Sequence, residues 1–451
     1  MTTLQRVISA SEVSINGNFF KLLRPVQTVL SSQYPTKVLQ GDITGDSQQR
    51  LSATRWSDAR GGIGTKDQEG GDVTRIWYGT SHLRVQGHRT LPDLVTTTAV
   101  SGATGVFTVG AMAEFNDEIY VAFSTSVRKF DFSGDSWGSS LHTLPAFATD
   151  ALTARLGGTV YMVFAHTNGM TYTTDGSSFT DITDDALHLA EWDDRLWAID
   201  NTGQLRWAFD PTDTWTDDAQ LPLENANVRD LFVARDASDE EILYASTRVG
   251  LFAHDAANNR FVKTRMTLPF HADSGQGVVV WREATYIPAG LAIYKYNIGG
   301  SGGVITTVGP DKKQGLPADR RGKIVRLEST HNDLVLLIDD TSAGAEDFDS
   351  FASSGMASHG SQVMNTATGR SLILGFDETG YQVLWESGAN EQAMDYSLVS
   401  NAYGGYRLWF AQNERVHYMA LPVDVVNPSE ISDRVYAASS RDEFPWFDAG
   451  Q

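Results

Sequence analysis

Short apolar runs interspersed with polar residues, each followed by a turn, recur along most of this chain. Residues 194–200 and 205–209 are two such runs, and a glycine-containing turn at 201–203 separates them. This arrangement predicts a β-hairpin. An apolar run at 187–192 precedes the hairpin and a short segment near Trp215 follows it. The unit therefore reads as four consecutive β-strands.

The same four-strand unit recurs, and a large side chain in its second strand marks each copy. The markers are Trp77, Tyr120, Tyr161, Trp197, Tyr244, Tyr286, Val335 and Trp409. Successive markers lie 36 to 49 residues apart, except for the last interval of 74 residues. Four strands per roughly 40–50 residues is the period of a β-propeller blade. The pattern predicts an all-β fold, a single large β-propeller of eight blades, with seven as the alternative because the unit at Val335 is the least regular.

The chain divides into three parts on this interpretation. Residues 1–50 form an N-terminal closing segment, residues 51–422 form the propeller, and residues 423–451 form a C-terminal docking tail. A loop insertion at about 341–362, rich in Ser, Gly and Ala, accounts for the long last interval. A ring needs a strand from one terminus to complete its last blade. We expect residues 19–23 or 27–30 to supply that strand.

The amino-acid composition argues against several classes of function. The chain carries 35 basic and 56 acidic residues, a net charge of −21, which disfavours a nucleic-acid partner. The acids are 39 Asp and 17 Glu, and this excess of Asp favours turns over helices. The absence of Cys excludes disulfides, thiolate metal sites and a cysteine nucleophile. No apolar run approaches 18 residues and the N-terminus lacks a signal peptide, so we expect no membrane insertion.

The motifs that resemble known sites are structural rather than catalytic. Residues 173–179, with the sequence TTDGSSF, resemble the Asp-box of sialidase-type propellers, a turn between outer strands, and weaker kelch-like turns occur at Asp135 and Asp213. A sialidase would need three arginines around one carboxylate. The arginines within or beside blade strands are Arg128, Arg206, Arg248 and Arg326, and their spacing alone does not bring them together. We predict no catalytic residue, although accidental carboxylate pairs leave glycoside hydrolysis open.

Metal and cofactor sites have weak support. Asp42 and Asp46, in the sequence GDITGD, are the candidate calcium ligands, but the loop lacks the closing bidentate acid, so a turn is the favoured interpretation. The ten His residues show no metal-binding spacing. The glycine-rich residues 299–303 lack the Lys of a phosphate-binding loop. We predict no resident metal and no cofactor.

Large apolar residues in the insertion and the tail are the candidate partner-binding residues. These are Phe348, Phe351, Phe444, Trp446 and Phe447. A terminal Phe-Pro-Trp-Phe sequence rarely lacks a docking surface. That surface is either the chain's own propeller or a neighbouring subunit.

Four short motifs stand close together near the N-terminus: GDITGDS at 41–47, WSD at 56–58, GGIG at 61–64 and RIWY at 75–78. In this combination they resemble a module of tailed-bacteriophage tail and virion proteins. It implies a non-enzymatic structural component of a virion tail, assembled in the host cytoplasm. Its implied partners are other virion proteins, further copies of itself, and a host-surface receptor or glycan. It implies no catalytic residue.

Two other functions stay open at this point. The first is a carbohydrate-binding or glycan-cleaving, sialidase-like propeller, with a pocket at the centre of the ring. The second is a kelch-like interaction protein of a cell, which would be a stable monomer. A ring centre that gathers arginine and carboxylate groups would favour the first, and a centre filled with apolar side chains would count against it.

Overall fold

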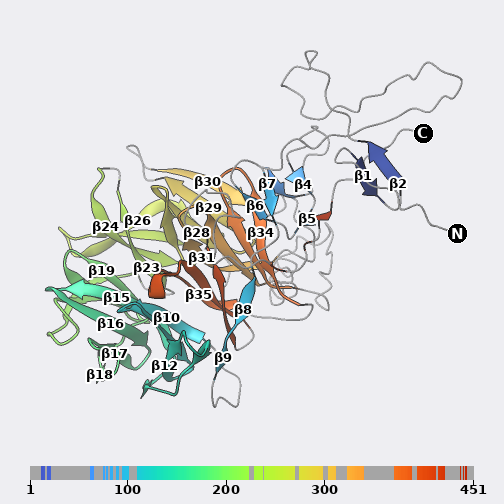
Figure 1. Ribbon diagram of the computed structural model, residues 1–451. Coiled ribbons are helices and arrows are strands. Elements are labelled where there is room, and N and C mark those ends of the chain that lie inside the picture. Colours follow the sequence, from blue (N-terminus) through green and yellow to red (C-terminus); the bar gives the residue numbers. More distant parts are fainter. Residues whose placement is uncertain are drawn as a thin grey trace, which may run out of the picture.

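The fold is an all-β ring of sheets, seen here in a computed structural model (Figure 1). The structure describes residues 12–15, 18–21, 61–64, 75–76, 78–79, 82–84, 88–90, 94–100, 109–222, 228–236, 238–269, 274–297, 303–310, 322–339, 370–388, 394–412, 415–421, 437, 440 and 442–443. In this part of the chain, no helix is long and apolar enough to cross a membrane.

Seven antiparallel sheets follow one another along the described chain, each a propeller blade. Blade 1 contains β10 (Val109–Phe115), β11 (Glu118–Phe123), β12 (Ser126–Asp131) and β13 (Ser136–Trp137), with β14 (His142–Thr143) beside β12. Blade 2 contains β15 (Ala148–Leu156), β16 (Thr159–His166), β17 (Gly169–Thr173) and β18 (Thr180–Ile182). Blade 3 contains β19 (His188–Trp192), β20 (Arg195–Ile199), β21 (Gln204–Ala208) and β22 (Thr216–Gln220).

The remaining blades repeat this meander. Blade 4 contains β23 (Val228–Arg235), β24 (Glu241–Thr247), β25 (Gly250–Asp255) and β26 (Arg260–Thr267). Blade 5 contains β27 (Val279–Trp281), β28 (Ala284–Ala289), β29 (Ala292–Asn297) and β30 (Val304–Gly309). Blade 6 contains β31 (Lys323–Ser329), β32 (Leu334–Asp339), β33 (Leu372–Phe376) and β34 (Tyr381–Glu386). Blade 7 contains β35 (Met394–Ser400), β36 (Arg407–Gln412), β37 (Arg415–Ala420) and β8 (Val95–Thr97).

The described chain therefore forms seven blades, which confirms the alternative prediction, and the main prediction of eight is wrong. Seven of the eight markers lie in the second strand of a blade, but the first one, Trp77, falls between the two-residue strands β4 (Arg75–Ile76) and β5 (Tyr78–Gly79). β3 (Gly62–Ile63) pairs in parallel with β34, and β4 pairs with β3, so this segment extends the outer edge of blade 6. A local apolar run identifies a strand but does not say which sheet the strand joins.

The ring is closed by a strand from the N-terminal side, as expected, but not by the expected residues. β8 pairs antiparallel with β37 and becomes the fourth strand of blade 7. β2 (Asn18–Lys21), which overlaps the predicted segment 19–23, instead forms a hairpin with β1 (Glu12–Ile15), and residues 27–30 lie outside the described residues. The Thr98 hydroxyl next to β8 donates to the Val416 carbonyl at 2.6 Å and accepts from the Trp137 indole at 2.8 Å. Thr98 thus joins blade 7 to blade 1.

The core lies between adjacent blades, where large aromatic side chains pack among aliphatic ones. Trp137, Trp197 and Trp409 are all fully buried. At the junction of blades 1 and 7, the Phe130 ring lies 5.0 Å from Trp137 and 4.9 Å from Trp409 in edge-to-face contacts. Each such pair contributes about 0.5–1.5 kcal/mol beyond the burial of its area. These contacts explain why the sequence markers are so often Trp or Tyr.

Aspartates initiate the turns between the third and fourth strands of five blades. They are Asp131, Asp175, Asp210, Asp255 and Asp377, and each accepts hydrogen bonds from residues two or three further on. In the predicted Asp-box, Asp175 Oδ1 accepts from the backbone nitrogens of Ser178 at 2.7 Å and Ser177 at 2.8 Å. These bonds hold the pKa of Asp175 well below its ordinary value. The Asp-box forms a turn here, and the excess of Asp reflects such turns.

Candidate functional site

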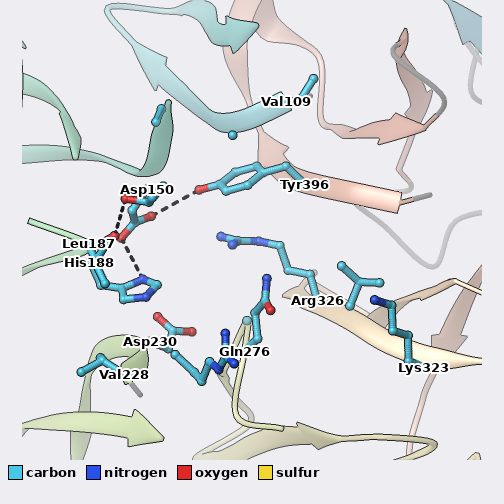
Figure 2. A pocket seen from close by; sticks show the side chains of 16 residues that line it. Val109, Asp150, Leu187, His188, Val228, Asp230, Gln276, Lys323, Arg326 and Tyr396 are labelled. Atoms are coloured by element: carbon cyan, nitrogen blue, oxygen red, sulfur yellow. Dashed lines mark hydrogen bonds and ion pairs between the residues drawn. The ribbon is translucent and has the colours of Figure 1, made fainter. Parts of the chain in front are cut away.

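A cavity of about 450 Å³ lies at the centre of the ring, where the first strands of the blades begin (Figure 2). All seven blades contribute to its wall, six through their first strand or the residue before it and blade 5 through the segment before β27. The polar lining residues are Thr149, Asp150, His188, Arg229, Asp230, Gln276, Lys323, Arg326 and Tyr396. A polar cavity at the centre of the ring makes it the candidate binding site.

β-bulges in the first strands shape this wall. The pairing register shifts between Ala148 and Asp150, between Val228 and Asp230, and between Ile324 and Arg326, with related shifts in β10 and β35. A bulge adds one residue to a strand and re-aims the side chains next to it. Asp150, Asp230 and Arg326 each follow such a bulge, and Figure 2 shows their side chains around the cavity.

Asp150 and Asp230 tie neighbouring blades together with the same geometry. Asp150 Oδ1 accepts from its neighbour Ala151 N at 2.9 Å, and its Oδ2 accepts from Leu189 N of blade 3 at 3.0 Å. Asp230 repeats both contacts, with Leu231 N at 2.9 Å and Val278 N, just before β27, at 2.6 Å. Both carboxylates therefore use part of their hydrogen-bonding capacity to accept bonds from backbone N–H groups of the ring.

The surroundings shift the ionisation of two lining residues. Burial raises the pKa of Asp230 to about 7, and repulsion from the Asp150 carboxylate adds to this effect. Burial lowers the pKa of His188, whose Nδ1 lies 3.9 Å from Asp150 Oδ2. At neutral pH, Asp230 is therefore partly protonated and His188 is largely neutral.

Arg326 is the cationic centre of the cavity. Its Nε donates to Glu328 Oε1 at 3.0 Å, and the same oxygen accepts from the Ser397 hydroxyl at 2.8 Å. Its guanidinium carbon lies 4.0 Å from the centre of the Tyr396 ring, a cation–π contact. Within the part of the chain that the structure describes, its two terminal nitrogens donate no hydrogen bond to the protein. These contacts fix the guanidinium while leaving donors for a ligand.

Two further features of the cavity are the charge of Arg326 and the hydroxyl group of Tyr396. Burial acts to lower the pKa of Arg326, but Tyr396, Glu328 and the pocket carboxylates raise it by more, so the side chain stays charged. The Tyr396 hydroxyl donates to Asp150 Oδ1 at 3.4 Å. The lining carries three cationic side chains, Arg229, Lys323 and Arg326, against two carboxylates. The Glu328 carboxylate next to the lining pairs with Arg326, so three cationic side chains face three carboxylates, and an anionic ligand would be bound by the terminal nitrogens of Arg326 rather than by a surplus of positive charge.

The ring centre thus gathers arginine and carboxylate groups, which favours the ligand-binding alternative over a filled channel. Of the four arginines considered from the sequence, only Arg326 lines the cavity. Arg128 lies on β12 and donates to Gly138 O, and Arg206 lies on β21 and pairs with Asp217. Three of these arginines therefore contribute nothing to a three-arginine sialidase site. Among the described residues no cluster of His, Asp and Glu is suited to a metal ion.

The partner-binding and calcium candidates named from the sequence all lie outside the described residues. They are Asp42, Asp46, Phe348, Phe351, Phe444, Trp446 and Phe447. Directly before the tail aromatics, β38 (Asp442–Glu443) pairs with β5. The tail therefore contacts residues 78–79 of its own chain at this point.

Sequence reasoning missed the cavity residues Asp150, Asp230 and Tyr396. One signal was present, because Asp230 and Arg326 are charged residues directly next to or within an apolar first strand. A charged side chain in a first strand is rarely buried between blades, so it indicates a residue that faces the central channel.

Comparisons with known proteins show the fold alone. No protein-family model and no curated protein matches this chain. Two solved structures of extracellular domains from B. thetaiotaomicron, described as parts of a hybrid two-component system and a one-component system, share 14% identity with TM-scores of 0.52 and 0.51. They match 74% and 72% of this chain but only 40% and 39% of their own length. YCF48 from Cyanidioschyzon merolae matches 75% of this chain and 99% of its own, with 7% identity and a TM-score of 0.49.

Proposed function

We propose that this protein is a non-enzymatic binding propeller whose central cavity holds the carboxylate of a small acidic ligand. The observation that carries the proposal is the Arg326 guanidinium, fixed by Glu328 and Tyr396 with its terminal nitrogens left as donors. Two parallel N–H donors of one guanidinium match the two oxygens of a carboxylate. An acidic sugar fits best, because Gln276, Tyr396 and Thr149 add groups that hydrogen-bond hydroxyls.

The wider role in this proposal is that of a receptor-facing component of a virion tail. It is supported by the resemblance of residues 41–78 to phage tail and virion proteins. A closed ring with its blades tied together by Asp150 and Asp230 is a rigid frame on which to present such a site. The ligand would then be an acidic group of a host-surface glycan.

The same contacts argue against glycan cleavage. Glycoside hydrolysis needs two carboxyl groups that face the scissile bond. The two cavity carboxylates accept backbone N–H bonds that hold the ring together, so their orientation is set by the blades. We therefore expect no turnover of acidic glycosides. Release of a chromogenic leaving group by the purified protein, abolished in Asp230→Asn, would make this protein an enzyme.

The direct experiment is calorimetric titration of galacturonate, with galactose as its uncharged partner. Wild-type protein should bind galacturonate more tightly than galactose. Arg326→Gln should weaken galacturonate binding by at least about tenfold, the size of one charge-assisted interaction. Arg206→Gln is the matched control and should bind like the wild type, because Arg206 is a partly exposed arginine outside the cavity lining that pairs with Asp217 and Asp200. Equal binding by both variants, or no binding by the wild type, contradicts the proposal.

A further inference from the structure

An exposed tyrosine in a left-handed backbone conformation stands at the junction of blades 7 and 1. Tyr403 belongs to the short 3₁₀ turn η5 (Ala402–Gly404) between β35 and β36, and its φ and ψ are 58° and 33°. A bulky side chain rarely adopts this conformation, because it is strained without support from the surroundings. Yet 64% of Tyr403 is exposed to solvent. Packing of this side chain into the core therefore does not explain the strain.

Contacts from both blades fix the loop that carries Tyr403. The backbone nitrogen of Tyr403 donates to Asp117 Oδ1 of blade 1 at 2.7 Å, and Asn401 N donates to Glu114 Oε2 at 2.9 Å. On the blade 7 side, Arg407 Nη1 donates to Ala402 O at 3.2 Å. The strained residue is thus held at a set position on the surface.

The Tyr403 ring has one supported face and one open face. It stacks on Phe132 with 4.5 Å between ring centres and 11° between planes. Phe132 in turn packs against Phe130 at 4.9 Å and Trp409 at 6.1 Å, both buried aromatics of the core. The ring therefore rests on a rigid aromatic stack that leads into the molecule.

Two exposed carboxylates and one guanidinium contact residues in or next to this aromatic stack. Asp117 and Asp135 are exposed, and each has one carboxylate oxygen engaged, Asp117 with Tyr403 N and Asp135 with the Tyr418 hydroxyl at 2.8 Å. The Arg407 guanidinium lies 5.3 Å from the Phe132 ring. A flat aromatic face beside carboxylate and guanidinium groups is suited to a ligand with an apolar C–H face and equatorial hydroxyls.

We propose that Tyr403 is a stacking platform for the pyranose ring of a neutral glycan. The axial C–H groups of the sugar lie on the open face of the ring, and its hydroxyls donate to Asp117 and Asp135. The nearby carboxylates of Glu114, Asp117 and Asp135 repel acidic sugars, so this site selects neutral ones. It shares no residue with the central cavity and does not depend on Arg326.

The test uses variants that separate stacking from folding. Tyr403→Gly removes the ring and relieves the left-handed strain, which offsets the lost stacking on Phe132, so its melting temperature should stay close to that of the wild type while glycan binding is lost. Tyr403→Phe keeps the stacking face and should retain binding. Phe209→Ala removes another exposed aromatic residue, on blade 3, and is the matched control that should bind like the wild type.

The probes are cellohexaose, maltohexaose, mannohexaose and galactohexaose, read by saturation-transfer NMR at millimolar concentration. The expected result is a signal for at least one of them in the wild type, Tyr403→Phe and Phe209→Ala, and none in Tyr403→Gly. No signal for any of the four in the wild type, or an unchanged signal in Tyr403→Gly, would overturn the proposal. Arg326→Gln should leave the signal unchanged, so failure here and failure at the central cavity are distinguishable.

Discussion

Asp230 Oδ2 lies 2.6 Å from the backbone nitrogen of Val278, so a side chain of blade 4 holds the chain that enters blade 5. Asp150 and Leu189 repeat this contact between blades 2 and 3. Both aspartates follow a β-bulge and both line the central cavity. The same residues thus set the wall of the cavity and the stability of the ring.

The raised pKa of Asp230 predicts that acidification increases the contribution of this residue to the stability of the fold. The folded chain holds this proton up to a pKa of about 7, whereas an unfolded carboxyl group releases it near pH 4. The contribution is fully present below pH 4 and is lost as the pH rises through about 7, and its upper limit is about 4 kcal/mol. Urea unfolding of the wild type and Asp230→Asn between pH 4 and 8 measures it. The wild type should lose stability relative to Asp230→Asn as the pH rises from 4 to 8. A stability difference that stays constant over this range would rule the effect out.

The closing strand β8 predicts which N-terminal truncations fold. Because β8 begins at Val95, removal of residues 1–35 should leave a ring that melts cooperatively, whereas removal of residues 1–98 should abolish that transition. Circular dichroism melting of both truncations checks this. The substitution Thr98→Val tests the same junction with less disruption and should cost about 1–3 kcal/mol, since the buried indole N–H of Trp137 loses its acceptor, whereas Val416 O keeps the Thr98 backbone N–H. A fully stable 99–451 fragment would show that β8 does not close the ring.

Replacing Gly176 of the Asp-box with alanine adds a single methyl group and should lower the stability of the fold strongly. Its φ is +73°, and a Cβ there would lie 2.1 Å from the Tyr120 hydroxyl of blade 1. Gly158 has a φ of +87° with no atom within 4 Å of the added Cβ, so Gly158→Ala is the matched control. Gly158→Ala should cost about 1 kcal/mol from backbone strain alone. Gly176→Ala should cost clearly more in chemical denaturation, and equal costs would mean that the contact between blades is unimportant.

The aromatic residues of the C-terminal tail should determine the oligomeric state of the protein. Phe444, Trp446 and Phe447 follow β38, and we expect them to dock on a neighbouring subunit. Light scattering should then show a defined oligomer for the full chain and a monomer for a version ending at Pro428. The substitution Trp446→Ala should shift the full chain towards the monomer. Two compact monomers would place the aromatic residues on the chain's own surface.

The repeating unit could be predicted from the sequence because burial between blades imposes it. The second strands are buried on both sides, so Tyr120, Trp197 and Trp409 mark them clearly. The closing strand lacks such a signal, because β8 is an outer strand of sequence Val-Thr-Thr with no fully buried residue. Its partner could not be found from a pattern of apolar residues.

The cavity was harder to predict because bulges set its side-chain directions. A bulge shifts the pairing register by one residue, so alternation along the strand no longer tells which side chains face the channel. Asp230 and Arg326 come together from strands almost a hundred residues apart, and only the closed ring makes them neighbours. The Asp turns were predictable for the opposite reason, since Asp175 contacts residues two and three positions away.

The most direct test of the central claim is a crystal structure of the protein grown with galacturonate. We predict that its carboxylate lies in the central cavity, with both oxygens about 3 Å from the terminal nitrogens of Arg326. A structure with the sugar bound elsewhere, or with its carboxylate directed away from Arg326, would contradict the account.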